Sequence, residues 1–349
     1  MKTEFANDSS PQITTIIPTY RRPKFLKYAI QSVLDQTYKD LIVLVCDNAS
    51  GDETKSVVMS LAEKDPRVKY FCQQEHVSLE DNFETGLRLV TTPFYSFLCD
   101  DDFFLPWFYE TALTSLNQNP QAMMFAGGTL IVDHKQSLYQ VNKPPYEGLW
   151  NINSCQPEDL ANVTSQFIFT ANVFRKGEHE KLGRKDRKAG WDIMMTTNVL
   201  TNYSIQISSK LVVGYRIHPQ SASIQGRGKH GSCLNSEILE QSYLGDNPQL
   251  KTKFKHADNL SNKWKEFIIA TLQNNVYGAT FFYKIVKNEF KLKAFFLYFF
   301  GLVCKIPPIR KVLAILYSLY SKNKRKKKNK AANSEYIDLI YKYTFPIPD

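Results

Sequence analysis

Residues 13–47 read ITTIIPTYRRPKFLKYAIQSVLDQTYKDLIVLVCD, and this stretch sets the expected fold. The β-branched run at 13–18 ends at a proline, which is typical of a buried strand followed by a turn. Residues 24–36 carry apolar side chains at helical spacing, and residues 41–47 form a second continuous apolar run. The stretch therefore predicts a strand, a helix and a second strand.

The same alternation continues to about residue 100. Residues 52–64 and 79–90 are predicted helices, and residues 68–74 and 94–100 are predicted strands. Alternating strands and helices favour parallel strands, and continuous apolar runs suit strands that are covered on both faces. We therefore expect an α/β fold with a Rossmann-like, mostly parallel sheet flanked by helices and a helical C-terminal extension.

Polar clusters follow three of these strands, where open α/β sheets bind their ligands. They are PTYRRP at 18–23, DNASGD at 47–52 and DDD at 100–102. The sequence has no G-x-G-x-x-G or G-x-x-x-x-G-K-[ST] loop at these places, which argues against an ordinary dinucleotide or P-loop protein. The six cysteines are scattered without a C-x-x-C pair, so zinc-site spacing is absent too.

Asp47 and the triple aspartate are the candidate ligand-binding groups. Asp47 is suited to accept hydrogen bonds from a base or a ribose, but the DNASGD residues also suit a simple turn and helix cap, and both interpretations stay open. Clustered carboxylates at a strand end suit Mg²⁺ or Mn²⁺, with a solvated acidic turn as the alternative. On an extended backbone Asp100 and Asp102 would point one way and Asp101 the other.

The stretch at 14–52, followed by FYSFLCDDDFFLP at 94–106, resembles family 2 glycosyltransferases with the GT-A fold. The resemblance runs from about residue 13 to about residue 223. It implies inverting transfer of a sugar from a nucleotide-sugar, most often a UDP-sugar. The nucleotide-sugar-binding residues expected from it are Pro18, Thr19, Tyr20, Arg22, Asp47, Asp100, Asp101 and Arg216.

By the same resemblance the aspartate run is the metal-binding D-x-D element, and we expect Mn²⁺ or Mg²⁺ as cofactor. Many members read Asp-x-Asp-Asp here, and in that register Cys99 stands at the first aspartate. The alternative register uses Asp100 and Asp102. The expected metal ligands are Asp102, Asp101 and His218.

Two downstream segments extend the resemblance. RKAGWDIMM at 187–195 makes Asp192 the catalytic base at the start of a helix, although the preceding position is often Glu and here is Trp191. Without the family, Asp192 reads as a carboxylate favoured by the helix dipole. VVGYRIHPQSAS at 212–223 resembles a Tyr-Arg-x-His segment, in which Arg216 faces the diphosphate and His218 binds metal. The alternative for His218 is a surface histidine.

We expect four regions along the chain. They are a flexible N-terminus (1–12), a GT-A catalytic domain (13–225), a helical linker or cap (226–289) and a basic, aromatic-rich membrane-associating region (290–349). Within the catalytic domain, a nucleotide-binding half (13–105) precedes an acceptor half (106–225).

The charge of the chain is concentrated in its C-terminal region. Residues 284–330 hold 14 basic residues and one acidic residue, while the net charge of the whole chain is +10. The apolar run at 294–304 is short of the roughly 20 residues that span a bilayer. An apolar helical face beside a basic cluster at 322–330 favours an interfacial helix on anionic lipid, and a helical cap or a solvated tail are the alternatives.

These observations favour a cytoplasmic enzyme on the inner face of the cell membrane, since the polar N-terminus lacks a secretory segment. The expected partners are a nucleotide-sugar donor, a glycan or lipid-linked acceptor, and an anionic membrane surface contacted by residues 290–330. Nucleic acid is not expected, because the main body is nearly neutral. A catalytically inactive sugar-nucleotide-binding or scaffold protein remains the alternative function.

Overall fold

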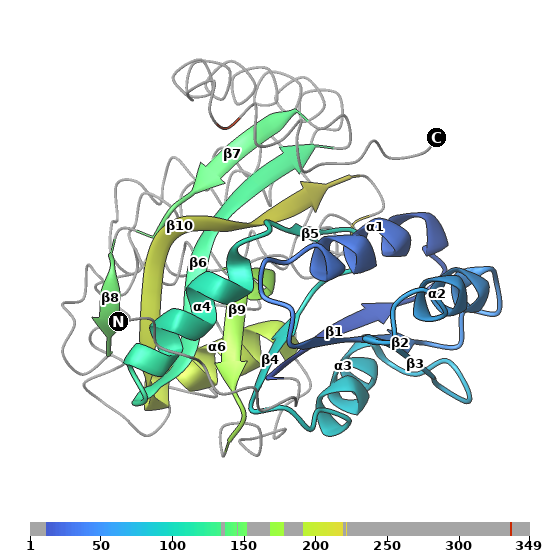
Figure 1. Cartoon of the computed structure of the whole chain (residues 1–349), viewed down its shortest axis with the longest axis horizontal. Helices are drawn as coiled ribbons and strands as arrows, with labels where there is room; N and C mark the ends of the chain where they lie inside the picture. The colour runs from blue at the N-terminus through green and yellow to red at the C-terminus, as the bar shows by residue number, and fades with distance from the viewer. Residues whose placement is uncertain are drawn as a thin grey trace, which may run out of the picture.

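The structure is a computed structural model that describes residues 12–133, 137–144, 146–151, 168–177, 191–218, 221 and 336. Ten strands form one sheet in the order β3-β2-β1-β4-β9-β6-β10-β5, with β7 paired to β6 and β8 paired to β10 (Figure 1). The strands are β1 Ile13–Thr19, β2 Leu41–Asp47, β3 Val68–Cys72, β4 Phe94–Phe97, β5 Phe103–Phe104, β6 Ala122–Asp133, β7 Leu138–Asn142, β8 Gly148–Trp150, β9 Asn172–Arg175 and β10 Ser204–Ile217.

The helices lie between these strands in the chain. They are α1 Pro23–Leu34, α2 Thr54–Ala62, α3 Leu79–Arg88, α4 Phe108–Gln118 and α6 Trp191–Asn202, with a short 3₁₀ helix η1 at Phe169–Ala171. The first six predicted elements are confirmed to within a few residues of their ends. The fourth predicted strand is shorter than expected, because β4 ends at Phe97 and the chain then turns.

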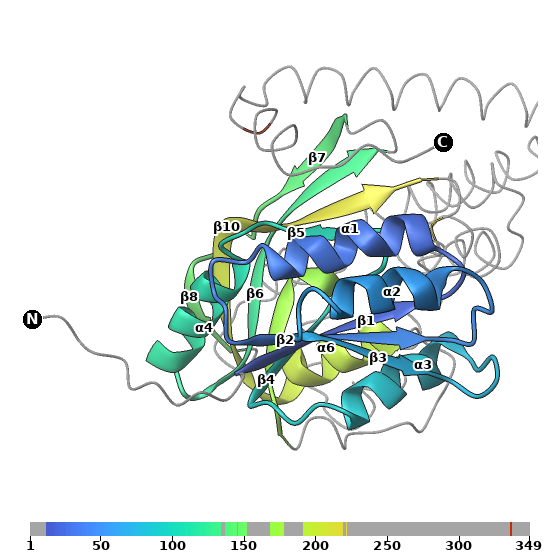
Figure 2. The same ribbon diagram turned by 45° about the vertical axis from the view of Figure 1, so that its right-hand side comes forward.

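Both faces of the parallel half are covered, as the continuous apolar runs predicted. On one face Ile13 and Ile17 pack with the apolar sides of α1, α2 and α4. On the other face Ile16 packs with α3 and α6 (Figure 2). Each fully buried aliphatic side chain contributes about 1.5–3 kcal/mol, so these two layers hold the strand ends in fixed positions.

The sheet changes character beyond β4. Strands β3, β2, β1 and β4 run parallel, but β9 lies antiparallel between β4 and β6. Strands β6 and β10 are parallel to one another, while β5, β7 and β8 add antiparallel edges. The α/β fold class is confirmed, and the expectation of a mostly parallel sheet applies to its N-terminal half. The C-terminal half is mixed because β9 reverses direction.

The structure describes little of the two ends of the chain. The predicted regions 226–289 and 290–349 lie outside the described residues, apart from Tyr336, as do residues 1–11. Tyr336 packs against the buried cluster of Phe103, Leu105, Leu130, Val132 and Leu211, and the Lys143 ammonium lies 5.2 Å from the Tyr336 ring centroid. Among the described residues, no helix is long and apolar enough to cross a membrane.

Candidate active site

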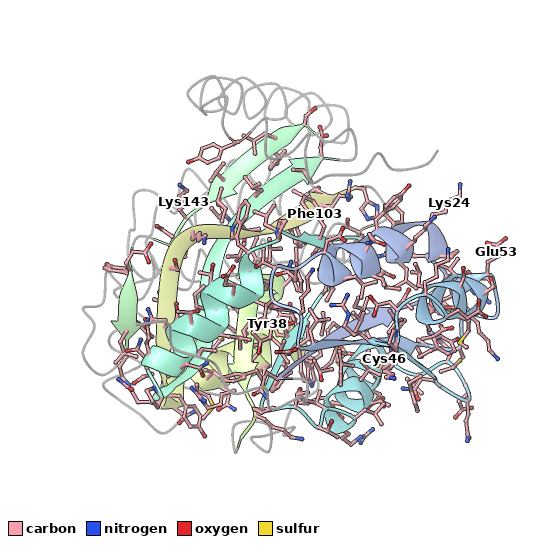
Figure 3. All side chains as sticks on the ribbon, viewed as in Figure 1. Lys24, Tyr38, Cys46, Glu53, Phe103 and Lys143 are labelled. Atoms are coloured by element: carbon pink, nitrogen blue, oxygen red, sulfur yellow. The ribbon has the colours of Figure 1, made fainter. Side chains whose placement is uncertain are left out.

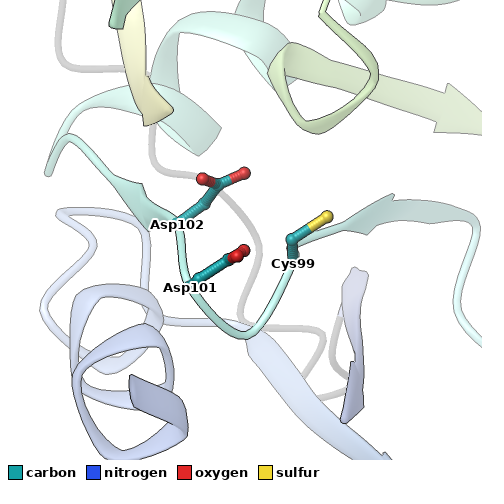
Figure 4. Close-up of side chains that lie close together, drawn as sticks. All are labelled: Cys99, Asp101 and Asp102. Carbon is teal, nitrogen blue, oxygen red and sulfur yellow. The ribbon is translucent and has the colours of Figure 1, made fainter. Parts of the chain in front are cut away.

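The triple aspartate lies in a tight turn between β4 and β5, where the Asp102 amide donates to the Cys99 carbonyl at 3.0 Å. The expected alternation of side chains is therefore wrong, since it assumed an extended backbone. The turn instead gathers the Cys99 thiol and the carboxylates of Asp101 and Asp102, whose ligand atoms all lie within 4.8 Å of one another (Figure 4).

Asp100 is held by the loop between β1 and α1. Thr19 Oγ1 donates to Asp100 Oδ2 at 2.8 Å, and Arg22 Nη1 donates to Asp100 Oδ1 at 3.1 Å. Burial, reinforced by the charge of Asp101 and opposed by Arg22, raises the pKa of Asp100 to about 6. Both oxygens of Asp100 are thus engaged by the protein, which ties the first strand to the aspartate turn.

Asp101 contacts two side chains from opposite halves of the sheet. Its Oδ2 lies 3.1 Å from Arg22 Nη1 and 2.8 Å from His218 Nε2. His218 stacks on Phe25 with ring centroids 5.0 Å apart, and its amide donates to Ser221 Oγ. His218 is 4% exposed, so the surface-histidine alternative is wrong. The Nε2 atom of His218 therefore lies beside a predicted metal-ligand carboxylate, and the role of His218 as a metal ligand stays a prediction.

Asp102 is the carboxylate with a spare ligand atom. Its Oδ1 accepts from the Arg216 amide at 2.8 Å, whereas Oδ2 is buried without a hydrogen-bond partner. Burial and the charge of Asp101 raise the pKa of Asp102 well above its usual range. The hydrogen bond from the Arg216 amide and the charge of Arg216 lower it, but by less. An orphaned buried carboxylate oxygen is costly to leave unpaired, so a divalent cation fits this position.

Arg216 braces the turn from β10. Its Nε donates to the Asp101 carbonyl at 3.0 Å, and its guanidinium carbon lies 5.6 Å from the Phe103 ring centroid. Burial lowers the pKa of Arg216, and the charges of Asp102 and Asp101 oppose the shift. Phe103 (labelled in Figure 3) lies directly against Gly214, where an added Cβ would come within 1.9 Å of the ring.

The predicted nucleotide-binding residues lie at the ends of β1 and β2. Asp47 is buried, with Oδ1 accepting from the Ser50 amide at 3.0 Å and Oδ2 accepting from the Tyr70 hydroxyl at 2.7 Å. Arg21 and Ala49 adopt left-handed backbone angles in these two adjoining loops, with φ of 54° and 56°. Such backbone strain is concentrated at functional sites.

Pro18 and Tyr20 flank the same loop. Pro18 is buried in β1 opposite Cys46 of β2. Tyr20 is 37% exposed, and its ring lies 4.3 Å from that of His76. A half-exposed aromatic beside a strand end is available to stack on a flat ligand group.

Asp192 lies in the first turn of α6, as predicted. Trp191 fixes this helix start by stacking on Phe83 at 5.3 Å, with its edge contacts to Phe97 at 5.0 Å and Phe169 at 5.8 Å. Burial is the largest cause that raises the pKa of the Cys99 thiol. The negative charges of Asp102, Asp101, Asp100 and Asp192 raise it further. The charge of Asp192 therefore acts on the aspartate turn.

Some site residues were missed from the sequence. Tyr70 and Phe25 read as ordinary apolar positions of a strand and a helix, and nothing in their spacing marked their contacts with Asp47 and His218. Cys99 was noticed as a departure from the aspartate pattern, but its place among the carboxylates depends on the turn.

Comparisons with known proteins identify the class of protein. The family described as "Glycosyl transferase family 2" matches residues 14–177. A GalNAc(5)-diNAcBac-PP-undecaprenol beta-1,3-glucosyltransferase of Campylobacter jejuni is 28% identical over 248 residues, covering 70% of this chain and 77% of that protein. An uncharacterized glycosyltransferase of Rickettsia typhi is 30% identical over 137 residues, covering 39% of this chain and 42% of that protein.

Among solved structures, a mannosyltransferase of Pyrobaculum calidifontis in complex with GDP-Man and Mn²⁺ has the same fold. Its TM-score is 0.53 at 17% identity, and the match covers 91% of this chain and 88% of that one. The family model, the relatives and the fold agree on one class: the chain is a glycosyltransferase with the GT-A fold, and its residues 14–177 match the family 2 model.

Proposed function

We propose that this chain transfers a sugar from a nucleotide-sugar, with inversion, to a hydroxyl group of a glycan or lipid-linked acceptor. The observation that carries the proposal is the aspartate turn at the end of β4. Three carboxylates are gathered there beside two arginines, and Asp102 keeps one buried oxygen without a partner. Such a site is suited to a diphosphate and a divalent cation.

The proposed donor is a UDP-sugar. In this proposal Asp47 and Tyr20, with the loop from Pro18 to Arg22, hold the nucleoside, while Asp100 and Asp101 lie toward the sugar and diphosphate. The Pyrobaculum neighbour was solved with a nucleotide-sugar of a different base, which supports a nucleotide-sugar donor without favouring UDP. A panel of UDP- and GDP-sugars, scored by release of the nucleoside diphosphate, tests the choice.

The proposed acceptor is a hydroxyl on a glycan or a lipid-linked glycan. The name of the Campylobacter relative includes an acceptor linked to undecaprenol through a diphosphate. The match covers most of this chain and most of that relative, which supports the proposal. We also propose that residues 290–330 hold the enzyme on anionic lipid at the cytoplasmic face. Replacing the basic residues of 322–330 by glutamine should release the protein from anionic vesicles, and unchanged retention would contradict this proposal.

In the proposed mechanism, Asp192 accepts the proton of the acceptor hydroxyl as its oxygen attacks the anomeric carbon. A bond forms between that oxygen and the carbon, and the bond to the nucleoside diphosphate breaks. Arg22 and Arg216 place positive charge beside the aspartates, where the leaving diphosphate gathers negative charge. A divalent cation held by Asp102 and Asp101 would supply further positive charge there.

The base is tested by Asp192→Asn, assayed with Mn²⁺ and a UDP-sugar. General base catalysis is worth on the order of 10²–10⁴ in rate, so turnover should fall by about a hundredfold or more. Asp81→Asn is the matched control, since Asp81 occupies the first turn of α3. It removes a favourable helix-dipole charge without touching the site. Equal effects of the two variants would show that Asp192 serves only its helix.

A further inference from the structure

In one register of the aspartate pattern Cys99 takes the first position, and the structure places its thiol beside Asp101 and Asp102. We propose that Cys99 Sγ is a ligand of the divalent cation, together with Asp101 and Asp102. A thiolate in the ligand set makes the site prefer thiophilic cations such as Co²⁺, Zn²⁺ and Cd²⁺ over Mg²⁺. The inference rests on the proposed function, because it concerns the same site.

The ligand atoms that remain after the protein's own contacts select this set. Both oxygens of Asp100 are occupied by Thr19 and Arg22. Asp101 uses one oxygen, Oδ2, for Arg22 and His218. Asp102 uses Oδ1 for the Arg216 amide, while its Oδ2 is buried and has no partner.

The side chain of Asp102 is 2% exposed, so water from the bulk does not readily satisfy that oxygen. Asp102 and Asp101 lie with Cys99 in one group, whose ligand atoms are within 4.8 Å of one another. Figure 4 shows the three side chains projecting from the same turn.

The electrostatic setting of Cys99 favours a cation. Three carboxylates follow it directly in the chain, those of Asp100, Asp101 and Asp102. Arg22 compensates two of them directly, through its contacts with Asp100 and Asp101. A cation bound among Cys99, Asp101 and Asp102 would relieve both the repulsion between the carboxylates and the unsatisfied acceptor of Asp102.

The chemistry of the donor set then decides which cation is favoured. Carboxylate oxygens serve Mg²⁺ and Mn²⁺, whereas thiolate sulfur selects softer ions. Metal–ligand bonds of about 2.0–2.3 Å allow two ligands of one ion to lie up to about 4.5 Å apart. The observed spread of 4.8 Å needs only a small side-chain adjustment to meet that limit.

The test is a Co²⁺ titration of the full chain in the absence of donor and acceptor. A sulfur-to-cobalt charge-transfer band in the near ultraviolet should appear with the wild type and be lost in Cys99→Ser. Cys72→Ser is the matched control, because Cys72 is exposed on β3 and should leave the band intact.

Competition of Cd²⁺ against Mg²⁺ gives a second measure. Loss of a residue that merely supports a metal ligand costs about 10–100-fold in affinity, so Cys99→Ser should lose at least tenfold in Cd²⁺ affinity relative to Mg²⁺. Cys99→Asp should move the preference toward Mg²⁺, since it replaces sulfur by oxygen. If Cys99→Ser does not fold, as judged by circular dichroism, Cys99→Asp decides the question.

The proposal is overturned if Co²⁺ binds without the charge-transfer band, or if the band survives in Cys99→Ser. Either result leaves the proposed sugar transfer standing, because the titration contains no donor. Conversely, undiminished sugar transfer after complete chelation of divalent cations would remove the metal from the proposed function, whatever Co²⁺ does at Cys99.

Discussion

Replacing Trp191 by alanine should separate helix positioning from catalysis. Trp191 makes three ring contacts, with Phe83, Phe97 and Phe169, and each aromatic pair is worth about 0.5–1.5 kcal/mol beyond its buried area. The free energy of unfolding should therefore fall by roughly 1.5–4.5 kcal/mol. Because Asp192 is the next residue, kcat should also fall, by about a hundredfold if the carboxylate moves by 1 Å.

Urea unfolding and steady-state kinetics on the same preparations measure the two effects. Trp191→Phe keeps an aromatic ring at the helix start, so it should recover most of kcat. Trp107→Ala is the control, since Trp107 packs elsewhere and its Nε1 donates to the Leu211 carbonyl at 2.7 Å. It should lower stability but leave kcat of the folded enzyme nearly unchanged.

The reasoning is refuted if folded Trp191→Ala keeps the wild-type kcat. It is equally refuted if Trp191→Ala and Trp107→Ala lower kcat by the same factor, since the loss would then follow general destabilisation. A rise in KM at constant kcat would place Trp191 in substrate binding and not in the orientation of Asp192.

Three further predictions concern single contacts. Gly214→Ala should destabilise the fold by about 1–3 kcal/mol in thermal unfolding, because its Cβ would overlap Phe103; a stability close to that of the wild type would contradict this. Asp100 has a pKa of about 6 in the fold against an ordinary value of 3.8, so the folded state binds more protons between these values and metal-free stability should fall as pH rises through that window. Asp100→Asn should make the metal-free stability less dependent on pH in this window, and an unchanged dependence would contradict the raised pKa of Asp100. Tyr70→Phe removes the hydrogen bond to Asp47 Oδ2 and should raise KM for the donor severalfold with little change in kcat, as measured by nucleoside diphosphate release.

The sequence predicted the parallel half of the fold well because its signals are local. Continuous apolar runs at 13–18 and 41–47 became strands covered on both faces, and helical spacing at 24–36 became α1. The mixed half was not predicted, since the reversal at β9 depends on pairing between segments far apart in the chain.

The site divides in the same way. The Asp100–Asp102 run stood out by residue type and by its place after an apolar strand, whereas Asp192 was singled out as the base only through the family resemblance. The sequence did not predict the turn that brings Cys99 to Asp102, because the expected alternation assumed an extended strand. The Asp101–His218 contact joins residues 117 positions apart, and only the family resemblance had placed both residues at one metal site. Contacts of that range come from the sheet order and are invisible to local patterns.

We propose above all that the aspartate turn after β4 binds the divalent cation that assists transfer from a nucleotide-sugar. The most direct test is nucleoside diphosphate release by wild type and Asp102→Asn, with a nucleotide-sugar panel and Mn²⁺. This substitution keeps one side-chain oxygen to accept from the Arg216 amide but replaces the orphaned carboxylate oxygen by an amide nitrogen. The account predicts release by the wild type that chelation abolishes and that Asp102→Asn lacks. Release by Asp102→Asn at the wild-type rate would contradict it.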